Sequence, residues 1–106
     1  MTAVVEADEA TLDSLLDAGD AVIVEFWAPW CSQCKAMAGT IERLAERVDG
    51  KASVLTVNVE AHPSVAEQHR VMTLPALLVM REGEVQARLE GFMRLPAIME
   101  KLGAYL

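Results

Sequence analysis

The chain has 106 residues, of which 53% are hydrophobic and 24% charged. About 100 residues is a common size for one domain with its own core, so we expect a single domain over residues 1–106. The same composition excludes an intrinsically disordered chain. The formal net charge of −7 would repel nucleic acids and anionic membranes, so neither is expected as a partner.

The sequence indicates neither export nor membrane insertion. No stretch reaches the roughly 18 to 20 apolar residues of a membrane span, and residues 1–9 have neither the basic nor the apolar region of a signal peptide. We therefore expect a cytoplasmic protein. In that reducing compartment, a disulfide between the two cysteines of the chain would be catalytic more often than structural.

The first half of the chain alternates strand and helix patterns. Residues 2–5 are expected to form a short edge strand, and residues 8–16 carry leucines at helical spacing after an acidic first turn. The nearly continuous apolar run over residues 21–27 is typical of a central strand buried on both faces. Residues 31–48 are predicted to form a long amphipathic helix, which Gly50 ends.

The second half adds a strand, a hairpin and two further helices. Residues 53–59 predict a second buried strand, and residues 63–69 a short helix with proline in its first turn. Residues 75–80 and 85–89 have the pattern of a β-hairpin, and residues 95–106 that of a closing amphipathic helix. The whole order predicts an α/β fold with a central mixed sheet of four to five strands flanked by about four helices.

Residues 27–35, Trp-Ala-Pro-Trp-Cys-Ser-Gln-Cys-Lys, carry the strongest chemical signal. They place Cys31 and Cys34 on the first turn of a predicted helix, directly after a buried strand. Unpaired N–H groups and the positive end of the helix dipole would stabilise a thiolate at the first sulfur. The spacing therefore predicts a redox-active dithiol, with Cys31 as the nucleophile and Cys34 as the resolving thiol.

Glu25 is a charged residue inside an apolar strand. A carboxylate is costly to bury unless it is paired or protonated, so burial would raise its pKa. The alternative is an outward-facing, solvated glutamate. The apolar neighbours Val24 and Phe26 favour burial.

The motif and the order of the elements together resemble the thioredoxin family over essentially the whole chain. Residues 26–31 resemble the family's passage from strand to active site, and residues 74–78 resemble the segment that begins with a cis-proline. Gly83 and Gly91 match the glycines before and after the last strand. The resemblance implies the thioredoxin fold, no cofactor, and reduction of disulfide-containing protein substrates by a protein that a thioredoxin reductase recharges.

The resemblance also implies residue roles. Glu25 would lie beneath Cys34 and act as its base through a water molecule. Pro75, in cis, would bring the backbone of Leu74 beside Cys31, where it could pair with a substrate peptide. The apolar surface that receives the substrate would consist of Trp30, Leu74, Pro75, Gly91 and Phe92.

Four features depart from the family's usual pattern. Ser32-Gln33 stands for Gly-Pro, Glu25 for aspartate, Thr56 for lysine and Gly39 for proline. The side chains of Ser32 and Gln33 could donate hydrogen bonds to the nucleophilic sulfur, and Lys35 would add positive potential. Because such donors favour the thiolate, we expect these residues to tune the couple to a less reducing potential than Gly-Pro would give.

Several alternatives stay open from the sequence. The protein could be a more oxidising isomerase or oxidase, a thioredoxin-fold interaction or chaperone-accessory module, or an iron–sulfur dimer that uses the thiols of two chains. A zinc site is not expected, because only His62 and His69 could complete it and their spacing is wrong. A monomer is expected because no second apolar face is evident.

Overall fold

Five strands and four α-helices make up residues 4–106, the part of the chain that the computed structural model describes. In chain order they are β1 (Val5–Glu6), α1 (Glu9–Asp17), β2 (Val22–Trp27), α2 (Ser32–Arg47), β3 (Ser53–Asn58), α3 (Pro63–Gln68), β4 (Ala76–Arg81), β5 (Glu84–Glu90) and α4 (Leu95–Leu102). The strands form one sheet in the order β1-β3-β2-β4-β5. This confirms the predicted α/β class.

The sheet is mixed, and β2 lies at its centre. Strands β1 and β2 run parallel to β3 on either side of it, β4 is antiparallel to β2, and β5 is antiparallel to β4. In this register Glu25 lies opposite Thr56 on β3 and Leu77 on β4. Neighbours on both sides and helices over both faces explain why β2 is apolar along nearly its whole length.

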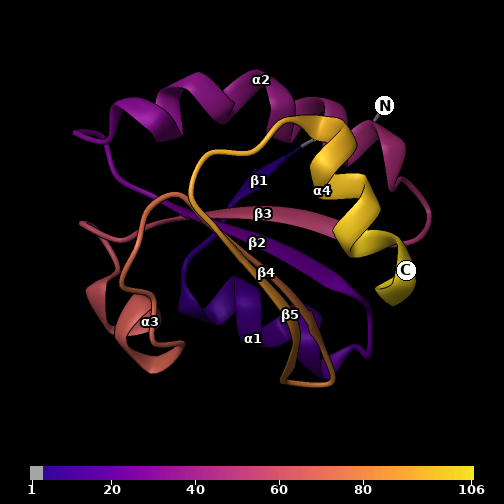
Figure 1. The fold of residues 1–106 in the computed structure, drawn as a ribbon. Helices are drawn as coiled ribbons and strands as arrows, with labels where there is room; N and C mark the ends of the chain where they lie inside the picture. The colour runs from indigo at the N-terminus through magenta and orange to yellow at the C-terminus, as the bar shows by residue number, and fades with distance from the viewer. Residues whose placement is uncertain (1–3) are drawn as a thin grey trace.

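Helices cover both faces of the sheet (Figure 1), with α1 and α3 on one side and α2 and α4 on the other. Val22, Val24 and Phe26 of β2 belong to the core beneath α1 and α3, whereas Ile23 belongs to the core beneath α2 and α4. Side chains alternate along a strand, so Glu25 points to the same side as Ile23. The central strand thus directs a carboxyl group toward α2.

Most element boundaries fall within one or two residues of the prediction, with two instructive differences. The hairpin strands extend until Arg81 pairs with Glu84, so its turn is only Glu82-Gly83. Both turn residues have positive φ, 55° and 81°, as two-residue hairpin turns of this kind require. The helix predicted to continue to Leu106 gives way at Gly103 to a 3₁₀ turn, because glycine is a poor helix former.

Half of the predicted edge strand over residues 2–5, namely residues 2 and 3, lies outside the described residues. Of the described half, Val4 is not in a strand, and β1 begins at Val5 and continues to Glu6. Within residues 4–106, no helix is both long enough and apolar enough to cross a membrane.

Gly39 offers a test of helix propensity in α2. A Cβ there would meet Arg43 Nη1 at 3.6 Å, an ordinary van der Waals contact. Because glycine costs a helix interior about 1 kcal/mol relative to alanine, Gly39→Ala should raise the free energy of unfolding by about that amount in urea denaturation. Gly50→Ala, at φ +82°, is the control and should lower it. A less stable Gly39→Ala variant would contradict this account.

Candidate active site

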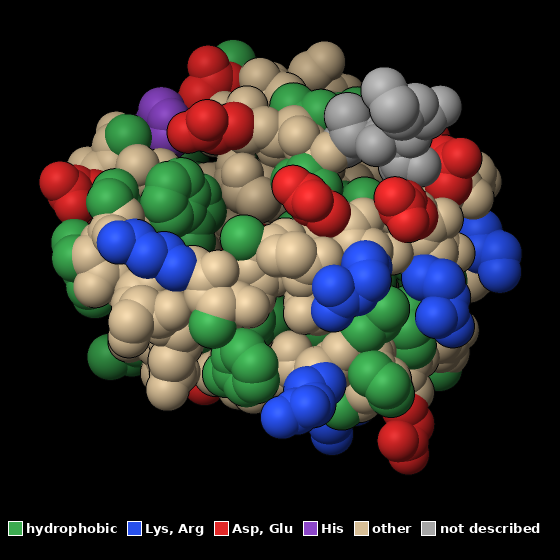
Figure 2. Space-filling view, turned by 90° about the horizontal axis from the view of Figure 1, so that it is seen from above, with side chains coloured by type: hydrophobic (Ala, Val, Ile, Leu, Met, Phe, Trp, Pro, Cys, Tyr) green, Lys and Arg blue, Asp and Glu red, His purple; other side chains and the backbone are tan. Residues whose placement is uncertain are grey.

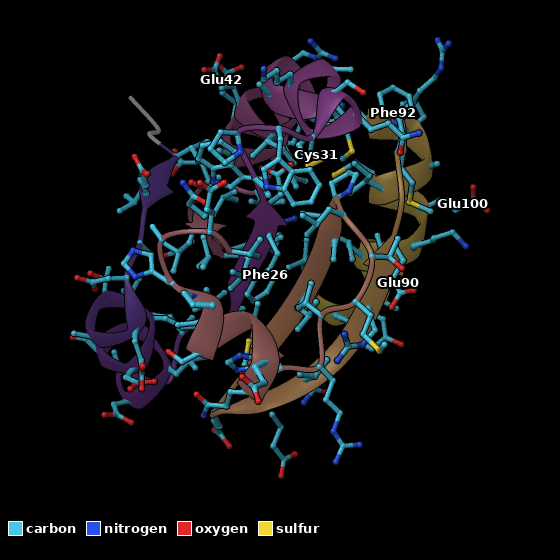
Figure 3. All side chains as sticks on the ribbon, turned by 90° about the vertical axis from the view of Figure 1, so that its left-hand side faces the viewer. Phe26, Cys31, Glu42, Glu90, Phe92 and Glu100 are labelled. Atoms are coloured by element: carbon cyan, nitrogen blue, oxygen red, sulfur yellow. A yellow bond between two sulfur atoms is a disulfide. The ribbon has the colours of Figure 1, made fainter. Side chains whose placement is uncertain are left out.

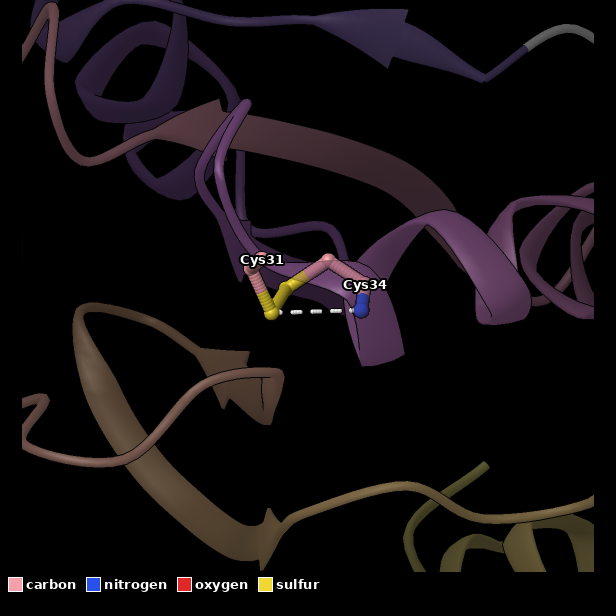
Figure 4. Close-up of a disulfide and its surroundings, with 2 residues drawn as sticks. All are labelled: Cys31 and Cys34. Carbon is pink, nitrogen blue, oxygen red and sulfur yellow. Dashed lines mark hydrogen bonds between the residues drawn. A yellow bond between two sulfur atoms is a disulfide. The ribbon is translucent and has the colours of Figure 1, made fainter.

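Cys31 and Cys34 form a disulfide at the N-terminus of α2 (Figure 4), with their Cα atoms 5.3 Å apart. Cys31 is the N-cap residue, and its Sγ accepts a hydrogen bond from the backbone N–H of Cys34 at 3.2 Å. The two side chains are 8% and 4% exposed, so Cys31 is slightly the more accessible. The two thiols that the sequence singled out therefore lie within bonding reach of each other.

The N-cap position gives the sulfur of Cys31 backbone N–H donors that other positions in the helix would lack. An N-cap side chain accepts from the N–H groups of the second or third helical residue, which here are Gln33 and Cys34. Proline at position 33 would remove one of those donors. The side chains of Ser32, Gln33 and Lys35 are themselves exposed to solvent.

The segment before β4 borders the disulfide. Leu74 and Val59 pack against the cluster that contains both cysteines. The Leu74–Pro75 peptide bond is cis, and the N–H of Gly91 donates to the carbonyl oxygen of Pro75 at 2.8 Å. Three of the predicted substrate-surface residues, Leu74, Pro75 and Gly91, thus come together at one end of the sheet.

The exposed aromatic residues Trp30 and Phe92 line different hollows. Trp30 is 70% exposed and lines a groove of about 560 Å³ together with Leu74, Val59 and residues of α3 and the loop after it. Phe92 is 45% exposed and lines a separate hollow with Arg43 and residues at the start of α4. Figure 3 shows Phe92 at the same end of the molecule as Cys31.

The hollow beside Phe92 opens on the face over α2 and α4. Figure 2 shows side chains of both charges among apolar ones on this face, but the charged residues that line the hollow are Arg43 and Arg94. The residues predicted to form the substrate surface therefore border two separate hollows, an apolar groove at Trp30 and a more basic hollow at Phe92. The sequence pattern did not separate them.

Sequence reasoning missed the far wall of the groove. It is formed by α3 and the loop that follows, including Val71 and Met72, and the side chain of Met72 is 93% exposed. Nothing in the sequence alone connects α3 to the cysteines.

Glu25 is buried, as predicted, and only 4% of its surface is exposed. Burial raises the pKa of its carboxyl group to about 7. Within residues 4–106, neither Glu25 Oε2 nor Trp27 Nε1 has a hydrogen-bond partner. The solvated alternative for this residue is therefore wrong.

Glu25 and Cys34 line the same cavity. It has a volume of about 360 Å³ and is lined by Glu25, Cys34, Thr56, Trp27 and Lys35, among others. The cavity is large enough and polar enough to admit water, which could relay a proton between the carboxyl group and the thiol. Thr56 faces Glu25 across the strands, so the neighbour opposite the carboxyl group is uncharged.

The histidines do not contribute to this site. The ring of His69 lies 6.1 Å from that of Phe26, and its Nδ1 is 2.9 Å from the carbonyl oxygen of Val65. Among residues 4–106, no three His, Cys, Asp or Glu side chains are grouped to hold a metal ion.

Comparisons with known proteins agree with this geometry. The family model described as Thioredoxin matches residues 3–104. Curated proteins named thioredoxin from Staphylococcus epidermidis and Staphylococcus aureus are each 36% identical to the chain over 104 residues. Each alignment covers 98% of this chain and 99% of the relative.

The raised pKa of Glu25 makes stability depend on pH. Between the ordinary carboxyl value of 4.5 and the folded value of about 7, the unfolded chain releases this proton while the folded chain retains it. The free energy of unfolding therefore falls as pH rises through this window. Since one pKa unit corresponds to about 1.4 kcal/mol, the loss should reach about 3 kcal/mol by pH 8.

Glu25→Gln should remove this loss, making the variant more stable than the parent at pH 8 and little different at pH 4. Urea denaturation at a series of pH values measures the effect. Glu42→Gln is the control, because Glu42 lines the same cavity but is exposed. Parallel pH profiles for the parent and Glu25→Gln would show that Glu25 ionises normally in the folded state.

Proposed function

This chain belongs to the thioredoxin family and acts as a thiol–disulfide oxidoreductase, and on that premise we propose how its residues divide the reaction. The dithiol form of Cys31 and Cys34 reduces disulfides in protein substrates, and a thioredoxin reductase regenerates it in the cytoplasm. The observation that carries this proposal is the Cys31–Cys34 disulfide at the start of α2, with Leu74 packed against the pair. The protein acts as a monomer.

Cys31 is the nucleophile of the first step. Its thiolate attacks one sulfur of the substrate disulfide, the substrate S–S bond breaks, and the other substrate sulfur leaves as a thiolate that takes a proton. The product is a mixed disulfide between Cys31 and the substrate. Its place as N-cap residue supports this role, because backbone N–H groups and the helix dipole stabilise negative charge on the sulfur.

Cys34 completes the reaction with the help of Glu25. The Cys34 thiolate attacks the Cys31 sulfur, the mixed disulfide breaks, and the second substrate sulfur leaves as a thiolate. Two electrons have then passed from the dithiol to the substrate. Glu25 accepts the proton of Cys34 through water in their shared cavity, and a pKa of about 7 suits the carboxyl group to proton transfer near neutral pH.

The substrate lies against the surface around the disulfide. The backbone of Leu74 pairs with an extended substrate segment, as a strand does when it is added to a sheet edge. The hydrogen bond from the N–H of Gly91 to the carbonyl oxygen of Pro75 holds the Leu74–Pro75 backbone in place for this pairing. Trp30 and Phe92 supply exposed apolar contacts on either side.

Ser32, Gln33 and Lys35 set the potential of the couple. Gln33 retains a backbone N–H that proline would lack, and the side chains of Ser32 and Gln33 can donate hydrogen bonds to a Cys31 thiolate. A stabilised thiolate favours the dithiol, which makes the couple less reducing. A sufficiently oxidising couple would make the protein an isomerase or oxidase, so the potential decides between these functions.

Replacing the resolving thiol should trap the reaction halfway. With Cys34→Ser, the first attack proceeds but the mixed disulfide persists, so a stable adduct on Cys31 should accumulate with a disulfide-bonded protein such as insulin. Nonreducing electrophoresis and intact-mass measurement detect it. Cys31→Ser is the matched control and should form little adduct. Equal trapping by both variants would exclude Cys31 as the specific nucleophile.

The double variant Ser32→Gly, Gln33→Pro should make the couple more reducing. If it raises the pKa of the Cys31 thiol by one unit, the reduction potential falls by about 30 mV. Equilibration with glutathione or dithiothreitol buffers measures this value. Lys35→Met removes only a nearby charge and should shift the potential less. A potential that does not change in the double variant would refute tuning by Ser32 and Gln33.

A further inference from the structure

Helix α3 ends in a turn that usually contains glycine, but the residue here is Arg70. The N–H of Val71 donates to the carbonyl oxygen of Ala66 at 2.9 Å, and the N–H of Arg70 donates to that of Glu67 at 3.1 Å. These two bonds define a Schellman motif. Arg70 has φ +56°, a left-handed conformation that disfavours any residue with a Cβ.

Arg88 supports this turn from the edge strand β5. Its Nη2 donates to the carbonyl oxygen of His69 at 2.7 Å, and its Nη1 donates to that of Arg70 at 3.3 Å. Arg88 pairs in register with Leu78, which belongs to the core beneath α1 and α3. The arginine therefore stands on the face of the sheet that carries α3, and it binds the carbonyl groups of the helix C-cap residue and of the residue after it.

The turn also determines where one wall of the groove lies. Arg70, Val71 and Met72 line the groove of about 560 Å³ that Trp30 and Leu74 also line. From this turn the chain runs to the start of β4, at the same end of the sheet as the start of α2 (Figure 1). A change in the turn would therefore move the groove wall while leaving the helix that carries the cysteines in place.

We propose that Arg88 is a positioning residue for protein substrates, because its guanidinium holds the left-handed turn at Arg70 and so fixes the wall of the groove beside the disulfide. This inference rests on the proposed function, in which a substrate segment occupies that groove. Arg88 does not touch the reacting sulfurs and takes no part in electron transfer. Its effect should appear in the binding of large substrates only.

Substrates of two sizes separate recognition from chemistry. A protein disulfide brings a flanking segment that fills the groove, whereas hydroxyethyl disulfide can reach Cys31 without it. The experiment measures kcat and KM for insulin reduction, and the rate with hydroxyethyl disulfide, using dithiothreitol as the electron donor. The reduction potential and the circular dichroism of each full-length variant are measured in parallel.

Arg88→Leu should raise KM for insulin by up to about fivefold, because a turn that has lost a surface hydrogen bond of ordinary strength holds the groove wall in place for a smaller share of the time. The insulin kcat, the hydroxyethyl disulfide rate and the potential should not change. Arg88→Lys should keep most of the affinity, because an ammonium group can still donate to the nearer carbonyl, that of His69. Arg81→Leu, an exposed arginine on the same hairpin, is the matched control and should behave like the parent.

A second variant tests the mechanism of support. Glycine adopts positive φ without strain, so Arg70→Gly should make the turn independent of Arg88. We expect Arg70→Gly, Arg88→Leu to have nearly the same insulin KM as Arg70→Gly alone. This comparison also removes any contribution that the Arg70 side chain makes to the groove.

Two results would overturn the proposal: an unchanged insulin KM in folded Arg88→Leu, or an equal loss of activity toward insulin and hydroxyethyl disulfide. An insulin KM that is clearly higher in Arg70→Gly, Arg88→Leu than in Arg70→Gly alone would show that Arg88 does not act by supporting the turn at Arg70. By contrast, a parent protein that reduces neither disulfide would contradict the proposed function itself. The two failures are therefore distinguishable.

Discussion

The burial of β2 on both faces is the constraint on which the site depends. An interior strand must satisfy its backbone through β3 and β4, and its side chains must fill two cores. Glu25 breaks this apolar rule and has an uncharged residue, Thr56, opposite it. Its carboxyl group therefore keeps its proton up to about pH 7, since the cost of ionisation in a buried site raises its pKa.

The same strand also places the carboxyl group of Glu25 near the two cysteines. Because β2 ends shortly before Cys31, the chain turns directly into α2, which Cys31 caps and whose first turn contains Cys34. Side-chain alternation then directs Glu25 to the side of the sheet that α2 covers, where its cavity also reaches Cys34. A carboxyl group that is half ionised near neutral pH can both accept and return a proton, which a reversible thiol–disulfide couple requires.

The sequence was most informative where local pattern and burial coincide. The apolar run of β2, the position of Cys31 as helix cap and the burial of Glu25 all follow from neighbours within a few residues. The groove wall does not, because it depends on how α3 packs against the sheet. Likewise, the bonds from Arg88 to the end of α3 join residues 18 and 19 positions apart, and no periodicity encodes such a contact.

In the proposed mechanism, electron transfer and substrate recognition therefore rest on parts of the fold that meet at Leu74 and Val59 but are otherwise different. The disulfide is supported by the end of β2 and the N-terminus of α2, whereas the groove wall is supported by a left-handed turn and an arginine on an edge strand. Changes in the turn can alter which proteins fit without altering the charge or hydrogen bonding at Cys31. Conversely, Ser32 and Gln33, which we propose to tune the potential, do not line the groove. A fold that separates these supports allows potential and substrate preference to vary independently.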